Sequence, residues 1–148
     1  MAGPNGEGGS GRPAVFADAD EVYRYLGAMF SQAVQQPFFV EATKDSGLVL
    51  LLTQTDPAAT MLIDFPRQKV VCGDAVVGSA WTVQLRMSSN NSNRFWQGHL
   101  NLTLALAQQK VKLDGKRSVA LKLIRLTEPL FAAYERILRD AGRHDLLV

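Results

Sequence analysis

The clearest pattern of apolar and polar positions lies between residues 80 and 87. Trp81, Val83, Leu85 and Met87 fall at every second position, and polar or charged residues separate them. Successive side chains of a strand point to opposite faces of its sheet. The alternation therefore predicts a strand with one buried and one solvated face.

Three shorter apolar runs precede this strand, at residues 48–53, 60–65 and 69–72. An Asp-Pro pair and a Pro-Arg pair separate the runs, and both are typical of turns. Turns spaced by roughly ten residues predict that the three strands form an antiparallel meander. The first run is apolar almost throughout, so we expect its strand to be buried on both faces.

Helical spacing of apolar residues marks the segment before these strands. Asp18 and Asp20 offer side-chain oxygens that can cap a helix N-terminus, and Pro37 is expected to stop the helix. The apolar stripe between them consists of Val22, Tyr25, Leu26, Met29, Phe30, Ala33 and Val34. Core packing explains the stripe, although part of it could also contact a bound ligand.

A second helix is predicted near the C-terminus. Thr127 can cap its start, Glu128 and Pro129 suit its first turn, and Gly142 can end it. One face carries Leu130, Phe131, Tyr134, Ile137, Leu138 and Ala141. Residues 118–126 alternate in polarity and lie outside this predicted helix.

Between the long strand and this helix, the pattern leaves two structures open. Residues 88–93 are polar and can cap a helix that carries Phe95 and Trp96. Residues 100–107 alternate like a strand, but their Leu-Ala content favours a helix. Spacing alone does not decide between these two.

The stretch from residue 94 to residue 115 resembles the signature region of the sterol carrier protein type 2 (SCP-2-like) family. Aligned without a gap, the conserved positions of that signature fall on Gly98, Leu100, Asn101, Gln108 and Gly115. The departures are His99 for Lys, Leu102 for Pro and Gln109 for Gly. With a weaker match at Ala120, Lys122 and Leu123, the resemblance covers about residues 18 to 140.

The resemblance implies an α+β fold, with a five-stranded, mainly antiparallel sheet and helices packed on one face around an apolar cavity. It implies a short helix at about 101–107 that opens onto this cavity, followed by an edge strand at 110–114. The implied function is non-catalytic binding of a lipid such as a fatty acid, a fatty acyl-CoA or a sterol-like molecule, with transfer of the lipid as a further role. A stand-alone bacterial member of the family is expected.

Candidate ligand-binding residues follow from this resemblance and from the apolar pattern. The polar candidate is Gln108, because the family's glutamine faces the cavity; capping of the short helix is the alternative role. The apolar candidates, each of which core packing also explains, are Trp81, Leu85, Phe95, Leu102, Leu106, Phe131 and Tyr134.

Composition narrows the classes of function. At 148 residues with 47% hydrophobic content, the chain suits one globular domain, predicted at 15–148 after a Gly- and Pro-rich disordered leader at 1–14. A net charge of +2 and no basic run interleaved with aromatics argue against a nucleic-acid partner. One cysteine, no signal-peptide pattern and no apolar run of membrane-spanning length favour the cytoplasm.

Catalytic chemistry finds little support in the sequence. No nucleophile elbow, phosphate-binding loop, dinucleotide fingerprint or zinc-binding His pair occurs, so no enzyme activity, cofactor or metal is expected. The two histidines, His99 and His144, are far apart in the sequence, and Cys72 ends an apolar strand, where it suits a small buried hydrophobe. An enzyme that uses His99 remains the least favoured hypothesis.

Two further partners stay open. Seven Lys or Arg residues between 116 and 143 form a solvated face or contact an anionic membrane surface or the phosphates of a coenzyme A ester. The alternative to a lipid carrier is an accessory or oligomerisation subunit whose apolar surface binds an enzyme partner.

Overall fold

The computed structural model describes residues 14–148, so the predicted leader lies almost entirely outside the described residues. Five strands form one sheet in the order β3-β2-β1-β4-β5. β1 and β4 run parallel, and the other neighbouring pairs run antiparallel. The strands are β1 (Val49–Thr55), β2 (Ala59–Asp64), β3 (Lys69–Cys72), β4 (Val83–Ser88) and β5 (Val111–Gly115). The predicted five-stranded α+β fold is confirmed.

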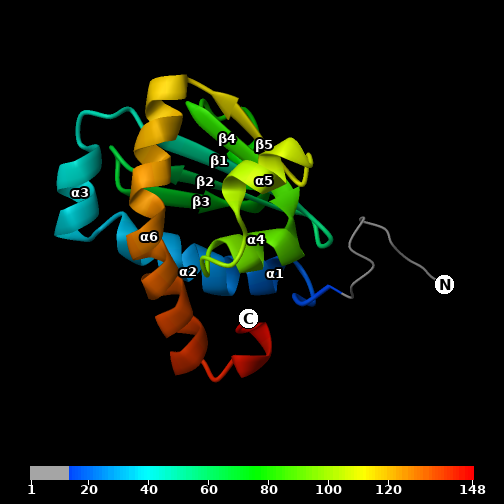
Figure 1. Cartoon of the computed structure of the whole chain (residues 1–148). Helices are drawn as coiled ribbons and strands as arrows, with labels where there is room; N and C mark the ends of the chain where they lie inside the picture. Colours follow the sequence, from blue (N-terminus) through cyan, green and yellow to red (C-terminus); the bar gives the residue numbers. More distant parts are fainter. Residues whose placement is uncertain (1–13) are drawn as a thin grey trace.

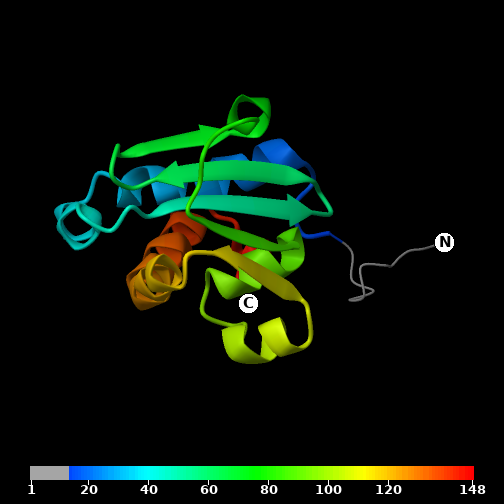
Figure 2. The same cartoon turned by 90° about the horizontal axis from the view of Figure 1, so that it is seen from above.

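Helices α4, α5 and α6 lie in front of the sheet in Figure 1, and Figure 2 shows the short 3₁₀ helix η3 on the other side. The N-terminal helix consists of α1 (Ala19–Val22), a π-helical turn η2 (Tyr23–Gly27) and α2 (Ala28–Ala33). The other helices are α3 (Pro37–Thr43), η3 (Gly73–Val76), α4 (Ser89–Phe95), α5 (Leu102–Ala107), α6 (Arg117–Asp140) and η4 (His144–Leu146).

One-sided cover explains the burial pattern of the strands. In β1, Leu50 and Leu52 are buried, whereas Val49 and Leu51 are only half-buried. The expectation that this strand is buried on both faces is therefore wrong, because the main helices cover only one face. In β4, the predicted alternation is confirmed from Val83 onward: inward residues such as Leu85 are buried and Arg86 is exposed. The strand begins at Val83, so the predicted residues 80–82 are not part of it.

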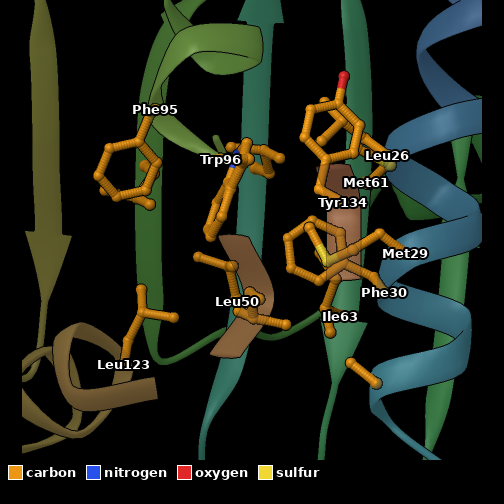
Figure 3. Packing of buried hydrophobic residues seen from close by; sticks show 14 of the residues in the cluster. Leu26, Met29, Phe30, Leu50, Met61, Ile63, Phe95, Trp96, Leu123 and Tyr134 are labelled. Carbon is orange, nitrogen blue, oxygen red and sulfur yellow. The ribbon is translucent and has the colours of Figure 1, made fainter. Parts of the chain in front are cut away.

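Aromatic side chains fill the space between the covered face and the helices (Figure 3). The indole of Trp96 is fully buried and meets the edges of two rings, with centroid distances of 5.0 Å to Phe30 and 4.7 Å to Phe95. Edge-to-face pairs of this kind add stability beyond the area they bury. All seven residues of the predicted N-terminal stripe are also buried, as expected.

The C-terminal helix is longer than predicted. α6 begins at Arg117 rather than at Thr127, and the exposed Pro129 lies inside it. The Thr127 hydroxyl does not cap a helix start: it donates to the Ile124 carbonyl at 2.8 Å. The prediction failed because residues 118–126 also have helical spacing, with Val119, Ala120, Leu123 and Leu126 buried.

The role of Pro37 also differs from the prediction, in which this residue ends the first helix. The first helix ends at Ala33, and Pro37 occupies the first turn of α3, a helix that the sequence pattern did not reveal. Proline suits this position because the first helical N–H groups have no partner within the helix. The predicted 101–107 helix and 110–114 edge strand are confirmed as α5 and β5.

Gly115 ends β5 with a φ of +122°, and a Cβ atom built there would lie 2.1 Å from the Thr82 carbonyl oxygen. Gly142 follows α6 with a φ of +71°, but open space surrounds its position. Both glycines thus have backbone conformations that disfavour a side chain, but only Gly115 also has a close contact.

We predict that Gly115→Ala lowers the free energy of unfolding by about 3 kcal/mol or more, since strain and collision add. The matched control Gly142→Ala should cost only about 1 kcal/mol, from backbone strain alone. Urea unfolding of the two variants measures the difference. Equal losses would contradict the close approach of β5 to the segment before β4.

Candidate functional site

Helices α4, α5 and α6 border the covered side of the sheet near β4 and β5, and capping side chains set the start of the first two. Ser88 caps α4 by accepting a hydrogen bond from the Asn91 N–H at 3.1 Å, and Asn101 caps α5 by accepting from the Leu104 N–H at 2.9 Å. Such caps replace partners that the first turn of a helix lacks. The polar residues before each apolar segment therefore fix where these helices begin.

α5 is apolar but poorly buried. Of its six residues only Ala105 is buried; Leu102 and Leu106 are half-buried, and Leu104 is 54% exposed. A surface helix normally turns its apolar stripe inward and a polar face outward. The composition of α5 thus leaves apolar surface without a protein partner among the described residues.

Six of the predicted ligand-binding residues lie on the covered side of the sheet. Leu85, Phe95 and Tyr134 are buried in the core, where they also act as packing residues. Phe131 on α6 meets Phe95 edge-on, with ring centroids 6.0 Å apart. The remaining two residues, Leu102 and Leu106 on α5, pack against the same core.

Trp81 lies apart from this group. It is 38% exposed and precedes β4, which begins only at Val83. Its indole lines a separate cleft of about 580 Å³ together with Leu51, Val76 and Val77. Leu51 belongs to the outward-facing positions of β1, so this cleft adjoins the other face of the sheet. The structure does not bring Trp81 together with the other predicted residues.

Gln108 is exposed and forms the C-cap of α5, where its backbone N–H donates to the Leu104 carbonyl at 2.9 Å. Its side chain lines a groove of about 800 Å³ at the end of β4. Leu100 and Met87 contribute apolar surface to this groove, but most of the other lining residues are polar or charged. Gln108 therefore lies where apolar α5 meets a polar groove.

Sequence reasoning missed a buried polar network beside α4. The Tyr134 hydroxyl donates to Asn93 Oδ1 at 2.7 Å, and the side-chain amides of Asn93 and Gln97 both donate to the Leu146 carbonyl at 2.9 Å. Asn93 and Gln97 are four residues apart, a helical spacing that places them on one face. Their position in a polar, cap-like segment concealed this role.

Known proteins with the same organisation identify the family. The model of the SCP-2 sterol transfer family matches residues 33–128, which include all five strands and the helices α3, α4 and α5. The chain belongs to the SCP-2 sterol transfer family. No sequence among the curated proteins matches it.

Several solved structures resemble this SCP-2 family protein. Sterol carrier protein domain 2 of Helicoverpa armigera has a TM-score of 0.62 at 20% identity, over 83% of this chain and 94% of that one. Sterol carrier protein 2 of Aedes aegypti, solved in complex with palmitate, has 0.50 at 24%, over 78% and 94%. A variant of the sec-alkyl sulfatase PisA1 has 0.50 at 15%, over 59% of this chain and 14% of that one.

The C-terminal segment of this SCP-2 family protein is held to the N-terminal helix by Arg143. Its guanidinium donates to Glu21 at 2.9 Å, to the Tyr25 hydroxyl at 3.1 Å and to Asp145. These hydrogen bonds hold the pKa of Tyr25 and that of Asp145 below their ordinary values. Burial instead raises the pKa of Tyr134 far above that of a free tyrosine.

Reactive and metal-binding groups are sparse in the described part of the chain. His99 is exposed, and Cys72 is half-buried with a thiol pKa raised by desolvation. Within residues 14–148, no three His, Cys, Asp or Glu side chains gather as a metal site would require. Over the same residues, no helix combines the length and hydropathy of a membrane span.

We predict that Tyr134→Phe lowers the free energy of unfolding by about 1 to 2 kcal/mol at neutral pH, because Asn93 Oδ1 loses a buried donor. The folded-state pKa of Tyr134 is raised, so its contribution is complete below the unfolded pKa of about 10 and is lost as pH rises through the folded value. Wild type should therefore lose stability above that pH more steeply than Tyr134→Phe in urea unfolding.

Tyr25→Phe is the control for this alkaline effect. The folded-state pKa of Tyr25 is lowered, so ionisation of Tyr25 favours the folded state at high pH. Its removal should leave the alkaline loss as steep as in wild type, or steeper. A flatter profile in Tyr25→Phe than in Tyr134→Phe would contradict the assignment.

Proposed function

We propose that this SCP-2 family protein reversibly binds a lipid between the covered face of the sheet and helices α4, α5 and α6, and transfers it between membranes or proteins. Candidate guests are a fatty acid, a fatty acyl-CoA and a sterol-like molecule. Membership of the sterol transfer family supports this proposal. So does the likeness to an Aedes aegypti carrier solved with palmitate.

The observation that carries the proposal is the set of exposed apolar side chains on α5 and on the N-terminal half of α6. Leu104 on α5 is 54% exposed, and Leu121 and Ile124 on α6 are 49% and 40% exposed. Exposed apolar patches commonly mark binding sites. The half-buried Leu102 and Leu106 connect this surface to the core, so separation of α5 from the sheet would open an apolar path inward.

Energetics favour an acyl chain as the guest. Each buried methylene contributes about 0.8 kcal/mol, so a chain of about sixteen carbons gains roughly 12 kcal/mol before the costs of binding. Loss of freedom on association reduces this gain to an affinity in the micromolar range or tighter. Binding and release by this means need no catalytic group.

The second candidate function is that of an accessory domain whose apolar surface binds an enzyme. The fold of this chain is similar to a part of a much longer sulfatase chain, which favours a domain of this kind acting beside an enzyme. A protein surface that covers Leu104, Leu121 and Ile124 would exclude the same apolar area from water. The two candidates therefore predict different occupants for one surface.

We predict that the delipidated full chain binds a fluorescent fatty-acid analogue saturably and that palmitate displaces it. Leu106→Gln should weaken binding about tenfold, because an amide then faces an apolar guest without a partner. The control is Thr103→Gln on the same helix, at an exposed polar position, where a loss of less than about twofold is expected. Fluorescence titration measures the affinities.

Urea unfolding of both variants verifies that each remains folded. Equal weakening in the two variants, or no change in Leu106→Gln, would contradict a site beneath α5. Absence of binding by folded wild-type protein, together with a stable complex with an enzyme, would favour the accessory role instead.

We further predict that Gln108→Ala weakens binding of the fatty-acid analogue about three- to tenfold, the contribution of one hydrogen bond to the polar end of the guest. Gln32→Ala, on the exposed face of α2, is the control and should bind as wild type does. If Gln108 only caps α5 through its backbone N–H, the variant should retain both its affinity and its thermal stability, because alanine keeps this donor.

A further inference from the structure

Four cationic side chains border the groove beside Gln108. Arg86 comes from β4, Arg94 from α4, and Lys110 and Lys112 from the segment that enters and forms β5. Asp56 is the one carboxylate among the groove-lining residues of the described chain. This excess of positive charge is local, since the whole chain carries a net charge of only +2.

Strand register brings two of these cations face to face. Arg86 on β4 and Lys112 on β5 are directly paired across the antiparallel strands, and both point away from the core. Like charges in directly opposite positions destabilise a sheet. Arg86 turns toward Asp114, with which it forms an ion pair, and so leaves Lys112 without a carboxylate. The strand register therefore leaves the positive charge of Lys112 at the groove without a paired carboxylate.

The other groups of the groove are suited to the same kind of ligand. Within the described residues, no hydrogen bond or ion pair involves the side chains of Lys110 and Lys112. Hydroxyl or amide groups of Thr53, Thr55 and Asn91 line the adjacent wall. Cations together with neutral donors match an anion that carries several acceptor oxygens.

The size of the groove indicates more than a bare ion. Its volume of about 800 Å³ lies in the range of sites that hold an organic ligand. Met87 and Leu100 give it an apolar wall that could contact a carbon skeleton attached to the anion. A carboxylate carries one charge, whereas a phosphomonoester near neutral pH approaches two charges and has three acceptor oxygens.

We propose that this groove is a binding site for a phosphomonoester, with Lys110, Lys112 and Arg86 as its charged contacts. The site goes beyond the proposed lipid function, because the phosphate can belong to a water-soluble compound or to the head group of an amphiphile. It also differs from a role of the lysines in protecting the edge strand β5 from association with other chains.

The experiment is calorimetric titration of the full chain at low salt with two phosphomonoesters, phenyl phosphate and dodecyl phosphate below its micellar concentration. Wild type is compared with the double variant Lys110→Gln/Lys112→Gln. The matched control is Lys44→Gln/Lys69→Gln, which removes the same charge from exposed positions outside the groove. Lys69 lies on β3, the opposite edge strand, so the control also removes a lysine from an edge of the sheet.

The groove variant is expected to bind the phosphomonoester about tenfold more weakly than wild type, and the control less than about twofold more weakly. Added salt should weaken wild-type binding, because exposed charges are screened. Binding of both compounds indicates a soluble phosphate ligand, and binding of dodecyl phosphate alone indicates a lipid head group. Each of these two results supports the site.

Three results would overturn the proposal: no binding of either compound by wild type, equal loss in the two double variants, or unchanged affinity in the groove variant. The uncharged fluorescent sterol analogue dehydroergosterol separates this failure from that of the lipid proposal. If wild type and the groove variant bind this sterol equally but neither phosphomonoester binds, the lipid site stands and the phosphate site does not.

Discussion

Burial of a single face of the sheet is the constraint on which the rest of the structure depends. The inward positions of β1 and β4, such as Leu50 and Leu85, require an apolar cover, and Trp96 supplies its centre. Because Trp96 lies just after α4, its burial fixes that helix against the sheet. The Tyr134–Asn93 hydrogen bond then joins α6 to α4, so two helices from distant parts of the chain share one core.

The same constraint leaves α5 weakly held. α4 and α6 already cover the central strands with fully buried residues, whereas α5 lies against the edge strand β5 and buries only Ala105. Elements with few buried contacts open more readily than the core. If the protein binds a lipid as proposed, the weak burial of α5 lets the lipid enter beneath this helix without disrupting the aromatic core around Trp96.

Local patterns predicted those parts of the fold whose residues contact neighbours close in sequence. The alternation of Val83, Leu85 and Met87 identified β4 correctly, and the family resemblance resolved residues 100–107 as a helix. α6 was predicted too short because Thr127, Glu128 and Pro129 imitate a helix start, while packing of Leu123 and Leu126 on the core carries the helix past them. Tertiary contacts outweigh such local signals.

The candidate site shows a sharper limit. Trp81 shares the period of β4 but lies before its first paired residue, so its periodicity did not place it with Leu85. The pairing of Arg86 with Lys112 depends on the register of β4 and β5, which joins positions 26 residues apart and has no local sign in the sequence. A pair of like charges in opposite positions on two strands can be recognised only when the fold is known.

The turn from Gln108 to Lys110 joins the two proposed sites. It ends α5, whose leucines adjoin the apolar path, and leads directly into β5, whose lysines border the groove. Gln109 has a φ of +60° in this turn, and the Lys110 N–H donates to the Ala105 carbonyl at 2.8 Å, so the turn is fixed by its own hydrogen bonds.

A guest that displaced α5 would therefore also move Lys110. An amphiphile with an apolar chain beneath α5 and a phosphate at Lys110 would interact with both sides of this turn, whereas a neutral lipid would interact with one. The two sites are thus separable in chemistry and coupled in structure.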